Sequence, residues 1–433
     1  MVAIGVFVLT AKGVVVTIRN STVFVLPSSD LATQTLLQSE VLQEKDGEAK
    51  AAEDDDDVKT KATERKPPAN RITAAELFCP QGSAILALLL IVDERRLVHY
   101  ELNLETKSLV LKASRSVPRS ATCMTVGHVK LSNKEIKYVI IVGQKTGEAV
   151  AMPFPDISRD LKTLLGHTTS MITDIAVNYH SSLLLTADRD EKLRVSRFPN
   201  AAIIESYCLG HAASVTKIAC SIVTPALVVS TSMDNTLKLW QMSTGTLLAS
   251  EVLLSNVEVS LDPLDINADN DNTGRLAAKS LINVSLAICP KTNIVAVLVN
   301  NEFLRLFSIV VANEVSTLSE LEISSEDVKT LLAGEPCELL FTENEMLAVS
   351  YKKNPFLQLF TISASDKNCK LSPVHVAPTA FDEFRNVASN IGLVVYDEDK
   401  ALDALEDGLK KKKARIGEWN KKILGANEKY MSK

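Results

Sequence analysis

The sequence predicts an all-β protein, a seven-bladed β-propeller with an acidic insertion and a basic, helical C-terminal tail. Two observations carry this prediction. Short apolar runs, alternating or β-branched, recur along the chain, and two adjacent segments repeat with a period of 44 residues. A period of about 40–45 residues built from short strands is typical of propellers. Closing such a ring removes unpaired sheet edges, so that short strands suffice for a stable scaffold.

The blades are predicted in chain order from strand-like runs bounded by turn residues. The first is expected to take strands from residues 5–28 and to be completed by a late strand at 392–396. The second and third are predicted at 71–117 and 120–162, and the fourth and fifth are the repeated segments that end near Leu254. After a long loop at 260–274, the last two are expected to use strands within 282–310 and 337–363.

Composition excludes several classes of protein. The 433 residues hold 47 Lys and Arg against 53 Asp and Glu, a net charge of −6, and 46% are hydrophobic, as in folded globular domains. The longest apolar run, 84–92, is too short to cross a membrane. The seven cysteines are scattered without a C-x-x-C pair, which argues against a metal site or disulfides and favours a reducing compartment.

Two charged segments lie outside the predicted blades. Residues 31–57 hold nine acidic and two basic residues, a net charge of −7, and 58–70 turn basic with two prolines. We expect residues 31–70 to be a disordered insertion within a propeller that spans 1–396. It is either a solvated loop without a partner or a segment that mimics or shields charge for a basic partner.

The C-terminal segment, 397–433, is predicted to be an amphipathic basic helix or tail. Residues 410–433 hold nine basic and two acidic residues, and Leu402, Leu409, Ile416 and Ile423 repeat every seven positions. The helix either caps the propeller or frays, or it packs on a partner while its cations meet RNA phosphates or serve nuclear import. The candidate RNA contacts are Lys410, Lys411, Lys412, Lys413 and Arg415.

The 44-residue repeat places the same residue types in register in two segments. This pattern resembles the WD-repeat family, whose blades bury a hydrogen-bonded tetrad of His, Ser or Thr, Asp and Trp. A catalytic triad is the alternative, but the repeat explains the spacing without chemistry and no nucleophile elbow is present. Ser196 stands where the first segment would need its Trp. The predicted structural tetrad is His211, Ser230, Asp234 and Trp240, with His167, Thr186 and Asp190 in the preceding blade.

Residues 184–211 closely resemble the same blade in the WD-repeat, non-catalytic subunit of the eukaryotic tRNA guanine-N7 methyltransferase. The resemblance implies that this chain binds and stabilises a separate catalytic subunit, as a heterodimer, for methylation of a guanine in the tRNA variable loop. It implies no catalytic residue, metal or cofactor here, since S-adenosylmethionine is expected on the partner. It also implies a nuclear location, with the cytoplasm left open, and a link to germ-line development in insect members.

The same resemblance points to a partner-binding site. In that family a basic residue of this blade pairs with an acidic residue of the catalytic subunit, and the matching position is Arg194, with Lys192 on the same strand face and Arg189 in the adjacent turn. The plain alternative is that these are solvated charges. Arg194→Glu is expected to abolish co-purification without unfolding the ring. The competing function is a general WD-repeat adaptor, in ubiquitin ligation or on chromatin, without RNA.

Overall fold

The computed structural model describes residues 72–103, 108–168, 170–254, 284–312, 315–351, 357–365 and 367–374, together with the backbone of short strands within 6–38. They belong to one compact unit, Met1–Phe381. The tail predicted at 397–433, the strand predicted at 392–396 and most of the insertion predicted at 31–70 lie outside the described residues.

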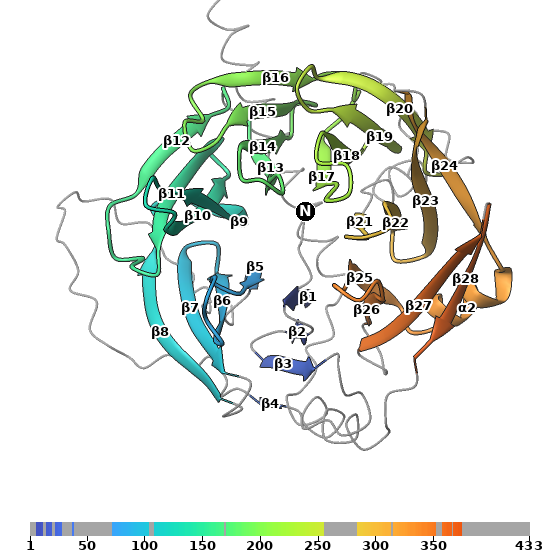
Figure 1. Ribbon diagram of the computed structural model, residues 1–433, viewed down its shortest axis with the longest axis horizontal. Coiled ribbons are helices and arrows are strands. Elements are labelled where there is room, and N and C mark those ends of the chain that lie inside the picture. Colours follow the sequence, from blue (N-terminus) through green and yellow to red (C-terminus); the bar gives the residue numbers. More distant parts are fainter. Residues whose placement is uncertain are drawn as a thin grey trace, which may run out of the picture. The chain divides into compact units, whose positions relative to one another are not determined.

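In the described part of the chain, the strands form seven antiparallel sets of four (Figure 1). The first set contains β1 Val6–Ala11, β2 Val14–Arg19, β3 Thr22–Pro27 and β4 Leu37–Gln38. The second contains β5 Ile72–Phe78, β6 Leu86–Val92, β7 Arg96–Asn103 and β8 Ser108–Ser116. The third contains β9 Ala121–Lys130, β10 Ile136–Gln144, β11 Glu148–Phe154 and β12 Lys162–Gly166. The fourth and fifth are β13 Ile172–Val177, β14 Leu183–Asp188, β15 Leu193–Arg197 and β16 Ile204–Cys208; and β17 Val215–Cys220, β18 Leu227–Ser232, β19 Thr236–Gln241 and β20 Thr246–Val252. The last two are β21 Val284–Ile288, β22 Ile294–Val299, β23 Phe303–Ala312 and β24 Val315–Ile323; and β25 Pro336–Phe341, β26 Leu347–Tyr351, β27 Leu357–Ser365 and β28 Asn368–Pro373.

The sets are arranged as a ring around a central axis (Figure 1). The innermost strand of each set contacts that of the next, from β1 through β5, β9, β13, β17 and β21 to β25, and β25 contacts β1. The last two sets also share a parallel pairing between β24 and β28. The predicted all-β propeller class is confirmed, whereas the blade count of the whole chain stays a prediction because 255–283 and the residues after Val374 lie outside the described part.

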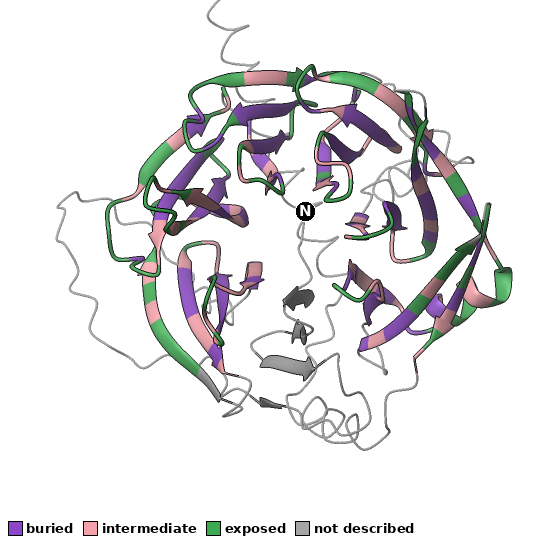
Figure 2. Ribbon diagram, viewed as in Figure 1, coloured by how far each residue is buried: buried purple, intermediate pink, exposed green. Residues whose placement is uncertain are grey.

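In four of the sets whose burial is described, the second strand is buried throughout. Every residue of β6, β18, β22 and β26 is buried (Figure 2). These strands lie inside the ring with neighbouring sheets packed on both faces, so β6 and β22 are apolar throughout instead of alternating. Strands β18 and β26 bury polar residues as well, among them Ser230 and Ser350. This packing explains the apolar run at 84–92, of which Leu86–Val92 fill a blade core while Ala84 is exposed.

Two features differ from the predicted order. The first set takes its fourth strand from β4, inside the range predicted as insertion, so this sheet has four strands without the one predicted at 392–396. Strand β24, strand β28 and the helix α2 Ser325–Leu332 were not predicted. The helix begins with Ser324 as N-cap, whose Oγ accepts from the Asp327 N–H at 3.1 Å. No helix among the described residues has the length and apolar character of a membrane span.

Candidate partner-binding surface

A buried hydrogen-bonded network joins the strands of the β17–β20 set. His211 Nδ1 lies 2.9 Å from Asp234 Oδ2, and His211 Nε2 lies 2.7 Å from Ser230 Oγ. Trp240 Nε1 donates to the same Ser230 Oγ at 2.8 Å. All three bonds are satisfied together when the His211 Nδ1–H donates to the Asp234 carboxylate and the His211 Nε2 accepts from the Ser230 hydroxyl, because the Ser230 oxygen can then accept from Trp240. The four residues predicted as a tetrad thus form one network.

This arrangement contradicts the alternative of a catalytic triad. Ser230 is 0% exposed, and its Oγ is already engaged by Trp240 and His211. A nucleophile must reach its substrate, which a fully buried hydroxyl in a packed blade does not. The network instead joins the turn after β18 to the strands on either side. It also gives each of these buried polar groups a hydrogen-bond partner, without which their burial would be unfavourable.

The preceding set contains a related network with a different carboxylate. His167 Nε2 lies 2.7 Å from Thr186 Oγ1, but His167 Nδ1 lies 2.8 Å from Asp188 Oδ2, so the prediction of Asp190 in this role is wrong. Asp188 closes β14 and is buried, while the Asp190 side chain is 48% exposed. In the β17–β20 set the Thr236 hydroxyl donates to Asp234 and holds that aspartate toward the histidine. The equivalent position in the β13–β16 set is Lys192, which has no hydroxyl to hold Asp190 in the same way.

The Arg194 side chain occupies the place that Trp240 fills in the next blade. It is 7% exposed; its Nε donates to Ser196 Oγ at 2.9 Å, and its terminal nitrogens donate to the carbonyls of Gly166 and Ala201 at 3.2 and 2.9 Å. Gly166 is equivalent to Gly210, against which the Trp240 ring packs. The small Ser196 side chain leaves room for this guanidinium. The prediction that Arg194 meets a partner at the surface is therefore corrected: here it is a structural residue.

The turn between β14 and β15 presents charged side chains to solvent. The Arg189 N–H donates to Met171 O at 3.0 Å, and the Lys192 N–H donates to Asp188 Oδ1 at 2.9 Å, so the backbone is held in place. The Arg189 side chain is 61% exposed, and Lys192 is exposed as well. Of the three residues predicted to bind a partner, Arg189 and Lys192 are accessible to one.

Apolar side chains lie beside this turn on the outermost strand of the blade. Tyr207 is 39% exposed and Leu209 is 60% exposed. The register pairs Leu193 with Cys208, so Leu209 follows β16 at the level of Lys192. Sequence reasoning missed them, although an outermost strand with apolar residues on its solvent face was the available signal. We call Arg189, Lys192, Tyr207 and Leu209 the turn-and-edge surface; apolar groups beside charges are typical of interaction sites.

The buried carboxylates make stability depend on pH. Burial alone would raise the pKa of Asp234, but hydrogen bonds from His211, Thr236 and the Ala212 N–H outweigh it and hold the pKa below its ordinary value. The pKa of Asp188 is also lowered, because the bonds from His167 and a backbone N–H outweigh burial. A carboxyl whose folded-state pKa is depressed stabilises the fold above its unfolded pKa, about 4, and loses that contribution as pH falls.

We therefore expect the free energy of unfolding to fall as pH is lowered from about 6 to about 3, and Asp188→Asn to flatten this dependence. Denaturant titrations at the two pH values measure it. Asp190→Asn in the exposed turn is the matched control and should keep the wild-type dependence. If the two variants exchanged these behaviours, the assignment of Asp188 to the buried network would be wrong.

A ring of four-stranded antiparallel sheets with a buried His–Asp–Ser–Trp network defines the class of WD40 propellers. The chain belongs to the tRNA methyltransferase TRM82 WD40 domain family, whose model matches residues 85–371. The family resemblance predicted from residues 184–211 is confirmed.

Curated relatives carry consistent names. The human tRNA (guanine-N(7)-)-methyltransferase non-catalytic subunit WDR4 is 34% identical over 45% of this chain and 47% of that protein. The subunit trm82 of Sclerotinia sclerotiorum is 26% identical over 70% of this chain and 54% of that protein. The subunit wuho of Aedes aegypti is 27% identical over 86% of this chain and 88% of that protein. The chain thus spans about half the length of the first two relatives.

Solved structures share the fold at low identity. A chain of the mitotic checkpoint complex superposes with a TM-score of 0.52 at 13% identity, covering 85% of this chain and 89% of that one. The β-propeller domain of Myceliophteria thermophila Cps50 (Swd1) gives 0.50 at 10% identity, covering 84% and 98%. These likenesses support the propeller fold alone.

Proposed function

We propose that this chain is the non-catalytic subunit of a tRNA guanine-N7 methyltransferase complex and is required for N7-methylguanine formation in the tRNA variable loop. The observation that carries the proposal is the family match over residues 85–371, together with relatives that are named as such subunits. The same names do not support the alternative of a general adaptor without RNA.

The proposed division of labour leaves the chemistry to the partner. The catalytic subunit binds S-adenosylmethionine and the target guanine, and this propeller holds that subunit in a heterodimer. Docking raises activity when the propeller has higher affinity for the active conformation of its partner than for the inactive one. A ring whose blades are tied by buried hydrogen bonds suits this role, because a stiff surface loses little entropy on binding.

We assign docking to the turn-and-edge surface. Arg189 and Lys192 supply exposed cations in a turn held by hydrogen bonds, and Tyr207 and Leu209 supply apolar area at its side. The same turn exposes Asp190 and Glu191, and Arg189 Nε lies 3.8 Å from Asp190 Oδ1, so the cations act individually in a turn without net charge. The family's ion pair with an acidic residue of the catalytic subunit then falls to these exposed cations, because Arg194 is occupied inside its own blade. An interfacial ion pair gains strength when the surrounding apolar groups exclude water.

The double substitution Arg189→Glu with Lys192→Glu is expected to weaken binding of the catalytic subunit by at least about tenfold, because like charges then face the partner. Both side chains are solvent-exposed, so thermal stability should stay close to wild type. Titration calorimetry measures the affinity, and tRNA N7-methylguanosine content in cells that carry only the variant measures the function.

The matched control reverses two exposed cations of another blade, Lys130→Glu with Lys134→Glu, and changes the net charge by the same amount. It should leave both the affinity and the methylguanosine content unchanged. Equal losses in both variants would mean that overall charge, not this surface, governs docking. Normal methylguanosine content in cells without the chain would refute the proposed function itself.

The basic C-terminal segment is proposed to touch tRNA phosphates and to promote nuclear import, with its net charge of +7 over residues 410–433 as support. Removing these residues should reduce the dependence of tRNA affinity on salt concentration by about 0.7–0.9 in logarithmic slope for each phosphate that the segment neutralises. Binding of the catalytic subunit should be unaffected, since phosphate contacts position the RNA and do not join the subunits.

A further inference from the structure

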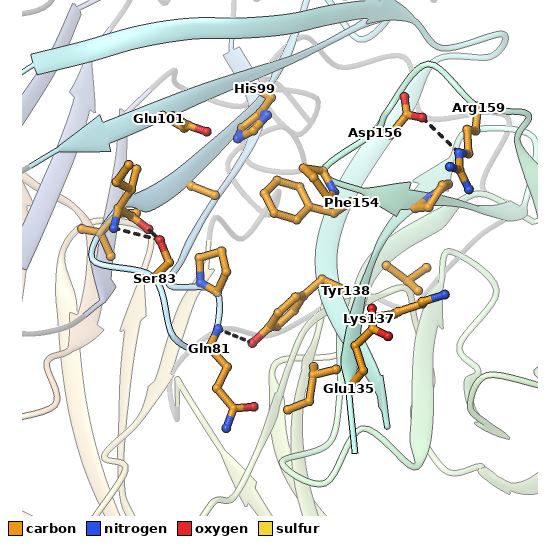
Figure 3. A pocket seen from close by; sticks show the side chains of 18 residues that line it. Gln81, Ser83, His99, Glu101, Glu135, Lys137, Tyr138, Phe154, Asp156 and Arg159 are labelled. Atoms are coloured by element: carbon orange, nitrogen blue, oxygen red, sulfur yellow. Dashed lines mark hydrogen bonds and ion pairs between the residues drawn. The ribbon is translucent and has the colours of Figure 1, made fainter. Parts of the chain in front are cut away.

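A cavity of about 600 Å³ lies between the β5–β8 and β9–β12 sets (Figure 3). The turn after β5, strand β7, strand β10 and the end of β11 contribute its walls. The lining carboxylate of Asp156 is paired with Arg159 at 3.0 Å, and that of Glu101 is paired with Lys112 at 2.8 Å. The charge of both carboxylates is therefore compensated by neighbouring cations at hydrogen-bond distance.

Asp190, in the turn between β14 and β15, has no such bond. Its carboxylate makes no hydrogen bond with the described residues, and its Oδ1 lies 3.8 Å from the Arg189 Nε. All four residues of this turn, 189–192, are exposed. Of the turns that join the second and third strands of a set and whose burial is described, it is the only one exposed throughout.

The equivalent turn of the next blade, residues 233–236, directs its aspartate the other way. The two turns share their backbone geometry, with a positive φ at the third residue of each. In the second turn, however, the Asp234 carboxylate points inward and accepts hydrogen bonds from the His211 ring, the Thr236 hydroxyl and two backbone N–H groups. All four residues of that turn are half-buried or buried. The outward position of Asp190 is thus not imposed by the turn itself.

Asp188 explains the outward position of Asp190. From the end of β14, Asp188 Oδ2 lies 2.8 Å from His167 Nδ1, and Asp188 Oδ1 accepts from the Lys192 N–H at 2.9 Å. The turn aspartate makes the equivalent bonds in the next blade, where the shorter Ser232 stands at the position of Asp188. Because one carboxylate already satisfies the histidine, a second one would be repelled from the buried network.

The exposed carboxylate lies among charges of both signs. Arg189 and Lys192 flank Asp190 and Glu191, so the turn carries two cations and two anions. A partner with only acidic groups would pair with the cations but would be repelled by the carboxylates between them. A surface that is complementary to this turn therefore presents a basic side chain beside an acidic one.

We propose that Asp190 is a further contact residue of the turn-and-edge surface, kept accessible by Asp188, and that it pairs with a basic side chain of the catalytic subunit. This inference rests on the proposed function, because it requires the catalytic subunit to dock on that surface. Asp188 is a positioning residue, since it is 1% exposed and acts through Asp190.

Asp190→Lys in the full-length chain is expected to weaken binding of the catalytic subunit by at least about tenfold in titration calorimetry, because two basic side chains then face each other. The unfolding temperature should stay close to that of the wild type, since the Asp190 side chain is 48% exposed. Asp160→Lys, at an exposed position of another blade, changes the net charge equally and should leave the affinity unchanged. Wild-type affinity of Asp190→Lys, or equal losses in the two variants, would overturn the proposal.

The double substitution Arg189→Glu with Lys192→Glu separates this inference from the proposed function. Lost binding in the double variant together with wild-type binding by Asp190→Lys would overturn the role of Asp190 and leave the docking surface in place. Wild-type binding by both would overturn the docking surface as well.

The role of Asp188 is tested on the full-length chain without the partner. Asp188→Ser with Lys192→Thr gives the turn the residue types of the β17–β20 set, and Asp190 is then expected to point inward to His167. In that background Asp190→Asn should lower the unfolding temperature by at least about 3 °C, against less than about 1 °C in the wild-type background. The catalytic subunit should bind the Asp188→Ser, Lys192→Thr chain more weakly than it binds Lys192→Thr alone.

Equal effects of Asp190→Asn in the two backgrounds would overturn the positioning role of Asp188. If the chain with both substitutions does not fold, the same comparison is made in Asp188→Ser alone, where His167 also lacks its carboxylate. Asp190→Asn should again lower the unfolding temperature more than it does in the wild type, and an unchanged effect would count against the proposal.

Discussion

Arg194→Glu is expected to destabilise the protein by about 3–5 kcal/mol and to leave little soluble, folded chain. The substitution places a carboxylate where the guanidinium donates to the carbonyls of Gly166 and Ala201, and those acceptors then face a negative charge in a buried site. Thermal unfolding followed by circular dichroism measures the effect, with a fall of roughly 10 °C in the midpoint. Loss of co-purification would then follow from unfolding.

The matched control is Arg197→Glu, at the end of the same strand. Arg197 is exposed and pairs with Glu205 at 2.6 Å, and such surface pairs contribute about 0–1 kcal/mol. Arg194→Lys keeps the charge but lacks the planar fork, so it should fall between the wild type and Arg194→Glu. If Arg194→Glu were as stable as the wild type and lost only its partner, the surface role first predicted for Arg194 would stand.

Trp240→Ala is expected to cost about 3–5 kcal/mol, the range for removing a large buried aromatic side chain. Trp240 is 0% exposed, packs on Gly210 and is the donor to Ser230 Oγ. Trp240→Phe keeps most of the packing and removes only the hydrogen bond, so it should cost about 0.5–1.5 kcal/mol beyond any change in packing. Urea titrations of the wild type and the two variants give the difference.

Tyr179→Ala provides the control for removal of an aromatic ring, since Tyr179 is 58% exposed and should tolerate the change. Equal costs for Trp240→Ala and Trp240→Phe would indicate that the hydrogen bond and not the packed ring dominates. Near-neutral values for both would contradict the role assigned to the network in holding the β17–β20 set together.

Strand prediction succeeded where burial imposes a simple pattern. The continuous apolar run at 84–92 contains β6, and the runs at 282–310 contain β21, β22 and most of β23. Strand β24 alternates exposed and buried residues, so its pattern was available in the sequence, but its polar composition masked it. Strand β4 has only two residues, and pairing with β3, not its own sequence, defines it.

The family and the propeller class were accessible from the sequence because the 44-residue repeat and the His, Ser and Asp types at fixed spacing are recorded along the chain. Spacing alone did not decide which aspartate reaches His167, since Asp188 and Asp190 lie two residues apart and only the distance across the blade separates them. The cavity between the β5–β8 and β9–β12 sets could not be predicted from the sequence either, because its walls come from residues far apart along the chain.

From the sequence by itself follow the repeat, the ring that it builds and the family, because hydrophobic periodicity and residue spacing are local properties of the chain. The tertiary structure alone decided that Arg194 points into its blade and that Arg189 and Lys192 remain outside. The physical reason is the missing tryptophan: Ser196 leaves a space beside Gly166, and a guanidinium that can satisfy three acceptors fills it.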